Sequence, residues 1–290
     1  MTKENKKDNE VYILGSNSHD EGNKTASKKK YIILSIVALL IIAIGAGIYF
    51  ASRTTQEDTA DYYFEPEETI EQTVTIIPDS ASAKIEGYIE VLNDTINDVP
   101  LNIYIPHNAT MSLALGMPDQ SDTTIVFTAM AADIRGDNQQ IVGDFVLSGN
   151  KLSRGIAKKG FCAIIDNTVS IGMGDETPLL QQAIDKGGSF FRQYPLVSGG
   201  QLIENKPKNK SYRRALAIRN DQVIMVESKG RASFHDLSQA LIDLGVTDAI
   251  YLVGGTAYGW YYTKDRTQHE FGKQEPDLPE TISYIIWRIK

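Results

Sequence analysis

The chain has 290 residues, of which 42% are hydrophobic and 23% are charged, which fits a folded protein and excludes a collagen-like, disulfide-rich or wholly disordered one. Residues 1–30 hold seven lysines against five acids and residues 31–51 hold no charge, so the remaining 22 Lys/Arg and 32 Asp/Glu give residues 52–290 a net charge of −10. Because binding to nucleic acid requires clustered lysine and arginine, this acidic body argues against a nucleic-acid partner.

The first predicted element is a transmembrane helix at residues 31–51, which read YIILSIVALLIIAIGAGIYFA. About 20 apolar residues cross a hydrocarbon core of ~30 Å as a helix. Lysines occupy positions 28–30, and the positive-inside rule puts that end of the segment in the cytoplasm. A single-pass anchor then leaves the C-terminal body on the extracytoplasmic side, in the periplasm. The alternative is a cleaved signal peptide, since residues 45–47 (GAG) resemble a cleavage site.

Two polar segments flank this helix. Residues 1–30 lack hydrophobic periodicity, which predicts a disordered cytoplasmic tail. Residues 52–80 are rich in Asp and Glu, which is typical of a solvated spacer and predicts an acidic stalk. The remaining residues, 81–290, are enough for one domain with a substantial core.

The first half of this domain is predicted to form β-strands, because runs of alternating or continuous apolar residues are bounded by turn residues. Asp166-Asn167 separates two of the strands and favours a hairpin, since Asp and Asn tolerate the positive φ angles of tight turns. Cys162, the single cysteine, is interpreted as a buried strand residue. The expected strands are residues 84–92, 101–105, 123–129, 141–147, 161–165 and 168–171.

Two helices have clear start and stop signals. Thr177 and Pro178 predict the start of the first helix, and Gly187 predicts its end. Ser233 and Asp236 have the spacing of a capping box at the start of the second helix. An apolar stripe follows in that helix before Gly245 ends it, and consists of Leu237, Ala240, Leu241 and Leu244.

A second hairpin precedes the second helix, and a buried strand follows it. Residues 214–219 are expected to pair with residues 222–227 around the turn Asn220-Asp221. The buried strand Ala249–Val253 ends in Gly254-Gly255-Thr256. Many strands, mostly joined by hairpins, with a few helices predict an α+β fold: a mixed, largely antiparallel sheet with a few flanking helices.

The turn Gly254-Gly255-Thr256 is the first candidate binding site. Glycines at the end of a strand let the backbone approach a ligand and present N–H groups to an anion. A plain tight turn would have the same sequence, so both interpretations stay open. Tyr258 and Trp260 follow the turn and could form a wall on which a sugar stacks, or could be packed in the core.

The basic segment 206–214, KPKNKSYRR, is the second candidate. Five cations in nine residues usually form a solvated surface. Arg213 and Arg214 differ from the lysines because they enter a strand, where neighbouring side chains face opposite sides. One of the two is therefore expected to point into the fold or a cleft, where a guanidinium can grip a phosphate with two hydrogen bonds.

Asp133, which follows the predicted strand 123–129, is the third candidate. A carboxylate at the end of a strand can serve as an acid or a nucleophile, and it can equally well start a turn. The histidines are isolated, and no pair of them has the spacing typical of metal ligands. We therefore expect no metal and no other cofactor.

The segments RRALAIRNDQVIMVE and SFHDLSQALIDLGVTDAIYLVGGT, within residues 213–256, resemble the phosphodiester glycosidase domain, the family of the uncovering enzyme. That family has an Arg entering a strand, a hairpin, a capped helix that ends in Leu-Gly, and a strand that ends in Leu-Asp-Gly-Gly. The stretches FFRQYPLVSGG at 190–200 and IVGDFVLSG at 141–149 are similar to two further family segments. The resemblance covers about residues 84–290.

Two departures from the family pattern affect the chemistry that the resemblance implies. Val253 stands in place of the acid of Leu-Asp-Gly-Gly, and a valine can neither accept a proton nor orient a hydroxyl. The Asn-x-Gly-Phe-Phe segment of the family is replaced by AADIR at residues 131–135, in which Asp133 is the candidate for a displaced carboxylate. Arg213 and the two glycines are retained.

The resemblance implies two functional hypotheses. In the first, the chain is a hydrolase of sugar-1-phosphodiester linkages in an envelope or extracellular glycan. Arg213 and Asp133 would then be catalytic, and the substrate would contact Arg214, Gly254, Gly255, Thr256, Tyr258 and Trp260. In the second, the fold has lost catalysis and is a module that binds glycan, phosphate or an envelope partner.

Overall fold

The computed structural model describes residues 74–76 and 87–290, which belong to one structural unit, residues 58–290. The predicted tail and transmembrane segment, and nearly all of the predicted stalk, lie outside these residues. Among the helices that the structure does describe, none is long and apolar enough to cross a membrane.

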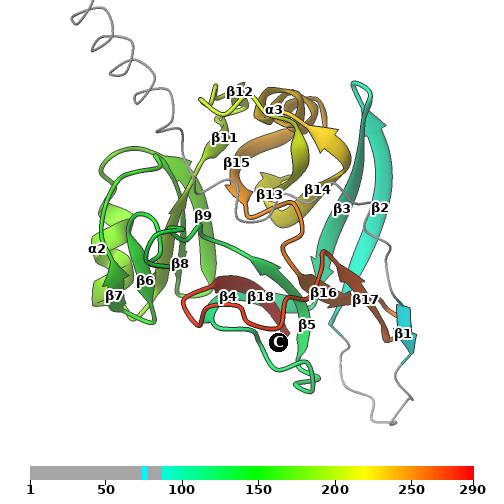
Figure 1. The fold of residues 1–290 in the computed structure, drawn as a ribbon, viewed down its shortest axis with the longest axis horizontal. Helices are drawn as coiled ribbons and strands as arrows, with labels where there is room; N and C mark the ends of the chain where they lie inside the picture. Colours follow the sequence, from blue (N-terminus) through cyan, green and yellow to red (C-terminus); the bar gives the residue numbers. More distant parts are fainter. Residues whose placement is uncertain (1–73, 77–86) are drawn as a thin grey trace, which may run out of the picture. The chain divides into compact units, whose positions relative to one another are not determined.

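The described strands form three antiparallel sheets (Figure 1). The seven-stranded sheet has the order β12-β11-β15-β13-β14-β3-β2. Its strands are β2 (Tyr88–Ile96), β3 (Val99–His107), β11 (Pro195–Ser198), β12 (Gln201–Leu202), β13 (Ser211–Arg219), β14 (Gln222–Ala232) and β15 (Val246–Leu252). The α+β class is therefore confirmed, but three antiparallel sheets replace the single mixed sheet that was expected.

The six-stranded sheet has the order β1-β17-β16-β5-β18-β4, so β18 lies between β5 and β4. Its strands are β1 (Val74–Ile76), β4 (Ala109–Leu115), β5 (Ile125–Met130), β16 (Gly259–Tyr262), β17 (Thr267–Phe271) and β18 (Ser283–Ile289). The five-stranded sheet has the order β7-β6-β10-β8-β9. Its strands are β6 (Phe145–Leu147), β7 (Asn150–Ser153), β8 (Gly160–Ile165), β9 (Thr168–Met173) and β10 (Ser189–Gln193).

Both predicted helices form where the capping residues indicate. Helix α2 (Pro178–Asp185) has Thr177 as its N-cap, and Gly187 follows it with a φ of 69°. Helix α3 (Phe234–Asp243) has the predicted capping box, in which Ser233 and Asp236 each bind the other's backbone N–H. In Figure 1, α3 packs on the seven-stranded sheet and α2 on the five-stranded sheet.

Two predicted hairpin turns are also confirmed. Asp166-Asn167 joins β8 to β9, and Asn220-Asp221 joins β13 to β14; all four residues have positive φ angles, as a two-residue hairpin turn requires. Cys162 is fully buried in β8, and burial raises the pKa of its thiol. The expected strand at 141–147 is mostly wrong, since only Phe145–Leu147 is a strand and Ile141 makes an isolated bridge with Ile134.

Two hydrophobic clusters lie on opposite faces of the seven-stranded sheet. One joins the apolar stripe of α3 to alternate residues of β13, such as Ala215 and Ala217. The other joins Leu216 to the six-stranded sheet. Aromatic rings are packed closely in this second cluster: the ring centroids of Tyr104 and Tyr261 are 5.1 Å apart. The alternation along β13 therefore sends neighbouring side chains into different environments.

Candidate functional site

Arg213 and Arg214 face opposite sides of β13, as strand geometry predicts. Both are buried, with 2% and 1% of their surface exposed. The guanidinium carbon of Arg213 lies 4.2 Å from the ring centroid of Phe234, at the start of α3. The guanidinium carbon of Arg214 lies 4.5 Å from the ring centroid of Phe271, in the six-stranded sheet. The two guanidinium groups therefore lie on opposite faces of the seven-stranded sheet and cannot bind the same ligand group.

Arg214 lies against the diglycine turn and binds a carboxylate. Its Nε donates to Glu227 Oε1 at 2.7 Å, and its Nη1 donates to the Ala257 carbonyl at 2.6 Å and the Val253 carbonyl at 3.4 Å. Its Nη2 is buried and has no hydrogen-bond partner among the described residues. The guanidinium thus holds both ends of the turn in place, and the two N–H groups of Nη2 lack an acceptor among the described residues.

Glu227 is held on its other side by a phenol. Tyr104 donates its hydroxyl to Glu227 Oε2 at 2.9 Å. Burial and the neighbouring Glu227 raise the pKa of Tyr104 well above its usual value, so the phenol stays protonated and remains a donor. With a guanidinium on one oxygen and a phenol on the other, the carboxylate of Glu227 has a fixed orientation.

A pocket of about 510 Å³ opens beside this carboxylate. Burial and then Glu227 raise the pKa of Tyr261 to about 12, and burial lowers the pKa of His269, whose ring stacks on Tyr261. Both rings are therefore uncharged near neutral pH, which leaves Glu227 and Lys229 as the charged lining groups. The lining residues are Val91, Asn93, Asn102, Tyr212, Glu227, Ser228, Lys229, Tyr261, Thr263, His269, Phe271 and Gly272.

The diglycine turn packs against the backbone beside this pocket. The Gly254 N–H donates to the Tyr251 hydroxyl at 3.0 Å, and the Gly255 N–H donates to the Tyr212 carbonyl at 2.8 Å. Both N–H groups are therefore used inside the protein, and the expectation that they present themselves to an anion is wrong. Glycine is required at 254 for space, since a Cβ atom there would lie 2.3 Å from the Tyr212 carbonyl oxygen. Thr256 is buried, and its carbonyl accepts from the Lys273 N–H at 2.8 Å.

Arg213 does not line the pocket beside Glu227. Its Nη2 donates to the carbonyl and the side-chain oxygen of Asn209 at 3.1 and 3.0 Å. Its guanidinium also lies 5.6 Å from the ring centroid of Tyr251, the residue whose hydroxyl accepts from the Gly254 N–H. The Arg213 guanidinium therefore lies against Tyr251, which binds the diglycine turn, on the face of the sheet that α3 covers.

Asp133 is buried and forms an ion pair with Lys158, which is also buried. The Lys158 ammonium lies 3.5 Å from the ring centroid of Tyr194. The Tyr194 ring is 5.2 Å from that of Phe234, the ring on which Arg213 rests. Asp133 and Arg213, the two predicted catalytic residues, thus flank one aromatic cluster and do not contact each other directly.

The predicted stacking wall is wrong. Trp260 is fully buried and only 1% of Tyr258 is exposed, so neither ring offers a free face to a sugar. The hydroxyl of Tyr258 accepts from Gln120 at 2.5 Å and donates to Glu270 at 2.7 Å. Both side chains belong to the core of the six-stranded sheet.

The family model for phosphodiester glycosidase matches residues 124–285, more than half of the 290 residues. The chain belongs to the phosphodiester glycosidase family. No curated protein matches the sequence.

Two solved structures are similar in fold to this phosphodiester glycosidase chain. One is the catalytic domain of zebrafish N-acetylglucosamine-1-phosphodiester alpha-N-acetylglucosaminidase, auto-inhibited by its pro-peptide; it is 12% identical, with a TM-score of 0.49 over 76% of this chain and 88% of that chain. The other is a hypothetical protein from Synechocystis, 11% identical, with a TM-score of 0.51 over 70% of this chain and 62% of that chain. The second likeness supports the fold alone.

Glu227 and Tyr104 were missed as candidate site residues. The sequence does allow Glu227 to be predicted. A two-residue turn at Asn220-Asp221 sets the register of the hairpin, and that register places Glu227 opposite Arg214. Tyr104 comes from β3 and pairs with Met225 of β14, a contact that the local sequence does not reveal. The described residues contain no group of three His, Cys, Asp or Glu side chains suited to hold a metal ion.

Proposed function

We propose that this phosphodiester glycosidase chain hydrolyses sugar-1-phosphodiester linkages in an envelope or extracellular glycan. The observation that carries the proposal is the pair of Arg214 and Glu227 beside a pocket of about 510 Å³. Small-molecule sites commonly have volumes of 300–1,000 Å³. The carboxylate that lines the pocket is Glu227, so it replaces Asp133 in the proposed chemistry.

The reaction breaks the bond between the anomeric carbon and the bridging oxygen of the phosphodiester. The bridging oxygen leaves with the phosphate, as a phosphate monoester, and water supplies the new anomeric hydroxyl. Glu227 stabilises the positive charge that develops on the sugar ring and takes a proton from the attacking water. Arg214 lies against Glu227 and keeps its carboxylate oriented.

The proposal includes the membrane anchor. The apolar run at residues 31–51, preceded by lysines at 28–30, supports a single-pass anchor with the phosphodiester glycosidase domain on the extracytoplasmic side, in the periplasm. Protease treatment of intact spheroplasts tests this topology. Cleavage of the C-terminal domain without cell lysis supports it, and full protection of that domain contradicts it.

The activity is tested with an alkyl phosphodiester of an N-acetylhexosamine-1-phosphate, by measuring release of reducing sugar and of the phosphate monoester. Glu227→Gln is expected to reduce kcat by at least a hundredfold, because the carboxylate acts on the reacting atoms. Glu204→Gln, at an exposed carboxylate, is the control and should retain the full rate. Equal background rates for the wild type and Glu227→Gln would overturn the proposal.

A second function, glycan or phosphate binding without turnover, is favoured by Val253. This residue occupies the position of the acid in the family pattern, and its carbonyl accepts from Arg214 Nη1. Val253→Asp distinguishes the two functions. A gain of hydrolysis from a background rate supports a binding module that has lost its acid, and an active wild type excludes it.

A further inference from the structure

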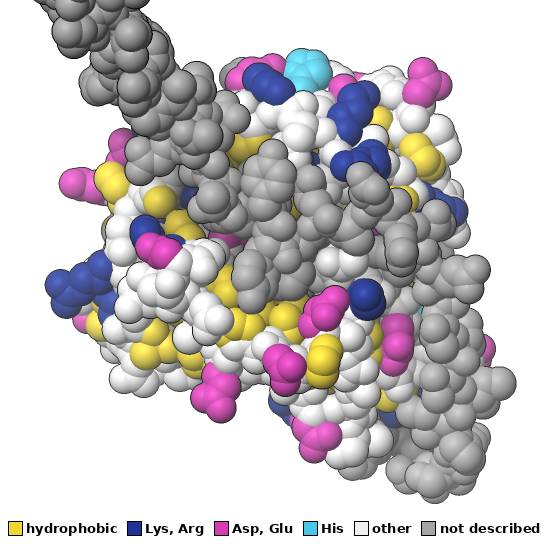
Figure 2. Space-filling model, in the orientation of Figure 1, with side chains coloured by type: hydrophobic (Ala, Val, Ile, Leu, Met, Phe, Trp, Pro, Cys, Tyr) yellow, Lys and Arg dark blue, Asp and Glu magenta, His cyan; other side chains and the backbone are white. Residues whose placement is uncertain are grey.

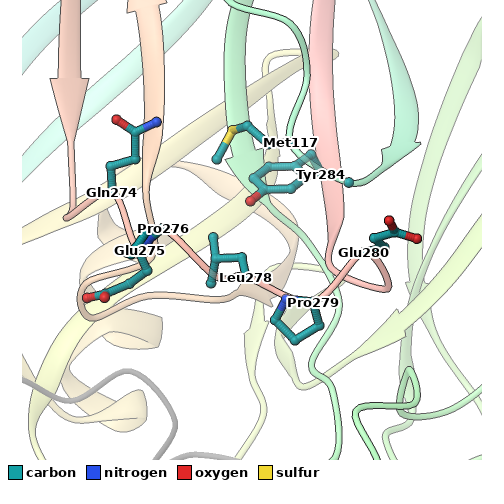
Figure 3. Close-up of a pocket in the computed structure, with 9 residues that line it drawn as sticks. Met117, Gln274, Glu275, Pro276, Leu278, Pro279, Glu280 and Tyr284 are labelled. Atoms are coloured by element: carbon teal, nitrogen blue, oxygen red, sulfur yellow. The ribbon is translucent and has the colours of Figure 1, made fainter.

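A second pocket, of about 460 Å³, lies between the exit from β4 and the loop that joins β17 to β18. It shares no lining residue with the pocket beside Glu227. Figure 3 shows the hydroxyl of Tyr284 directed into this space between Met117 and Leu278, with Glu275 and Glu280 on opposite sides. The lining residues are Gly116, Met117, Gln274, Glu275, Pro276, Leu278, Pro279, Glu280 and Tyr284.

Tyr284 is the first sign that the pocket receives a ligand. Only 1% of its surface is exposed, and its hydroxyl has no hydrogen-bond partner among the described residues. Burial raises the pKa of this phenol, so the hydroxyl stays protonated. A buried hydroxyl without a hydrogen-bond partner destabilises the folded protein, relative to phenylalanine at the same position. A ligand that hydrogen-bonds to the hydroxyl would recover this loss.

The frame of the pocket is fixed by the backbone before any ligand binds. Gly116 has a φ of 72°, and its N–H donates to the Ile282 carbonyl at 2.9 Å, which ties the exit of β4 to the start of β18. The Lys273 N–H donates to the Thr256 carbonyl at the other end of the loop. Pro276 and Pro279 restrict the loop between these points. Binding therefore costs little ordering of the chain.

The chemistry of the lining selects a class of ligand. The walls are apolar, formed by Met117, Leu278 and two prolines. The rim carries the carboxylates of Glu275 and Glu280 and the amide of Gln274, all of which accept hydrogen bonds. Figure 2 likewise shows acidic side chains beside hydrophobic ones on the lower half of the face in view. Apolar walls suit the C–H faces of a sugar ring, and carboxylates suit its hydroxyl donors.

We infer that this pocket binds a hexopyranose ring that is uncharged or carries an amino group. The ring packs between Met117 and Leu278, the Tyr284 hydroxyl bonds to a ring substituent, and Glu280 accepts from hydroxyl or ammonium groups. Glu275 is paired with Lys273 at 3.9 Å, so the carboxylate of Glu280 is the group that disfavours sugars carrying phosphate or carboxylate. This binding does not require hydrolysis at Glu227, and it gives the protein a second contact with a glycan.

The test measures binding of glucosamine, glucose, glucose 6-phosphate and cyclohexylamine to the full chain by ligand-detected NMR. Glucosamine and glucose are expected to bind, and glucose 6-phosphate at least tenfold more weakly. Tyr284→Phe should weaken both sugars at least tenfold, and Glu280→Gln should weaken glucosamine more than glucose. Asp277→Asn, in the same loop but outside the lining, is the matched control and should bind like the wild type.

Several results would overturn the inference. These are an absence of sugar binding by the wild type, equal binding by Tyr284→Phe, or binding of cyclohexylamine as strong as that of glucosamine.

Unfolding of the unliganded variants separates a ligand site from a structural role. Tyr284→Phe should be as stable as the wild type or more stable, whereas Tyr262→Phe, which loses a bond to Gln268, should be less stable. Glu227→Gln should keep sugar binding in this pocket, which separates it from the proposed hydrolysis.

Discussion

Replacing Glu227 by alanine is expected to destabilise the protein strongly, because it leaves Arg214 as an uncompensated buried charge. Arg214 is 1% exposed and Glu227 is 8% exposed, and their Nε–Oε1 distance is 2.7 Å. Removing one partner of such a buried pair costs about 3–5 kcal/mol. For a domain of this size the cost lowers Tm by roughly 6–20 °C.

The double variant Arg214→Met, Glu227→Leu is expected to be more stable than Glu227→Ala. Well-packed apolar residues can replace a buried ion pair at little cost. The hydroxyl of Tyr104, which donates to Glu227, then lacks a partner, which costs about 1–3 kcal/mol. Adding Tyr104→Phe to the double variant should recover most of this loss.

Urea unfolding followed by circular dichroism measures all these variants under one condition. The expected order of stability is the triple variant, then the double variant, then Glu227→Ala. A double variant that is no more stable than Glu227→Ala would refute this reasoning, because removing Arg214 as well should relieve the uncompensated buried charge.

Three further predictions concern stability. Gly254→Ala should cost about 1–3 kcal/mol by overpacking, since its Cβ would meet a backbone carbonyl oxygen at 2.3 Å; thermal unfolding measures the loss. Ser233→Ala should cost about 1 kcal/mol by removing the N-cap of α3, and a loss below a few tenths would contradict the capping role. Burial alone would raise the pKa of Asp144, but hydrogen bonds from Lys151 and Arg192 lower it overall. Its stabilising effect is therefore present above about pH 4 and lost as the pH falls further, so Asp144→Asn should be less stable at pH 7 and lose less stability in acid.

The sequence predicts those parts of the fold that depend on interactions between residues close together in the chain. The capping box of Ser233 and Asp236 and the turn Asn220-Asp221 act within a few residues, and both form as expected. Strand alternation correctly predicts that Arg213 and Arg214 face apart. It does not say which face meets the pocket, because that depends on whether α3 or the six-stranded sheet covers each side.

The remaining features depend on contacts between distant segments. The sequence leaves open whether Trp260 forms a stacking wall or packs in the core; β16 lies inside the six-stranded sheet, and Trp260 is fully buried there. Tyr104 joins the site only because β3 pairs with β14. The pocket around Tyr284 likewise needs the exit of β4 beside a loop more than a hundred residues later.

The position of β18 has a consequence for how the protein is made. This last strand pairs with both β4 and β5, so Ser283–Ile289 fills the gap between two strands synthesised long before it. Until the ribosome has delivered this strand, β4 and β5 have unpaired edges that could join other chains. Folding of this sheet therefore cannot finish until β18 has been synthesised, and a variant that lacks Ser283–Ile289 should aggregate during expression.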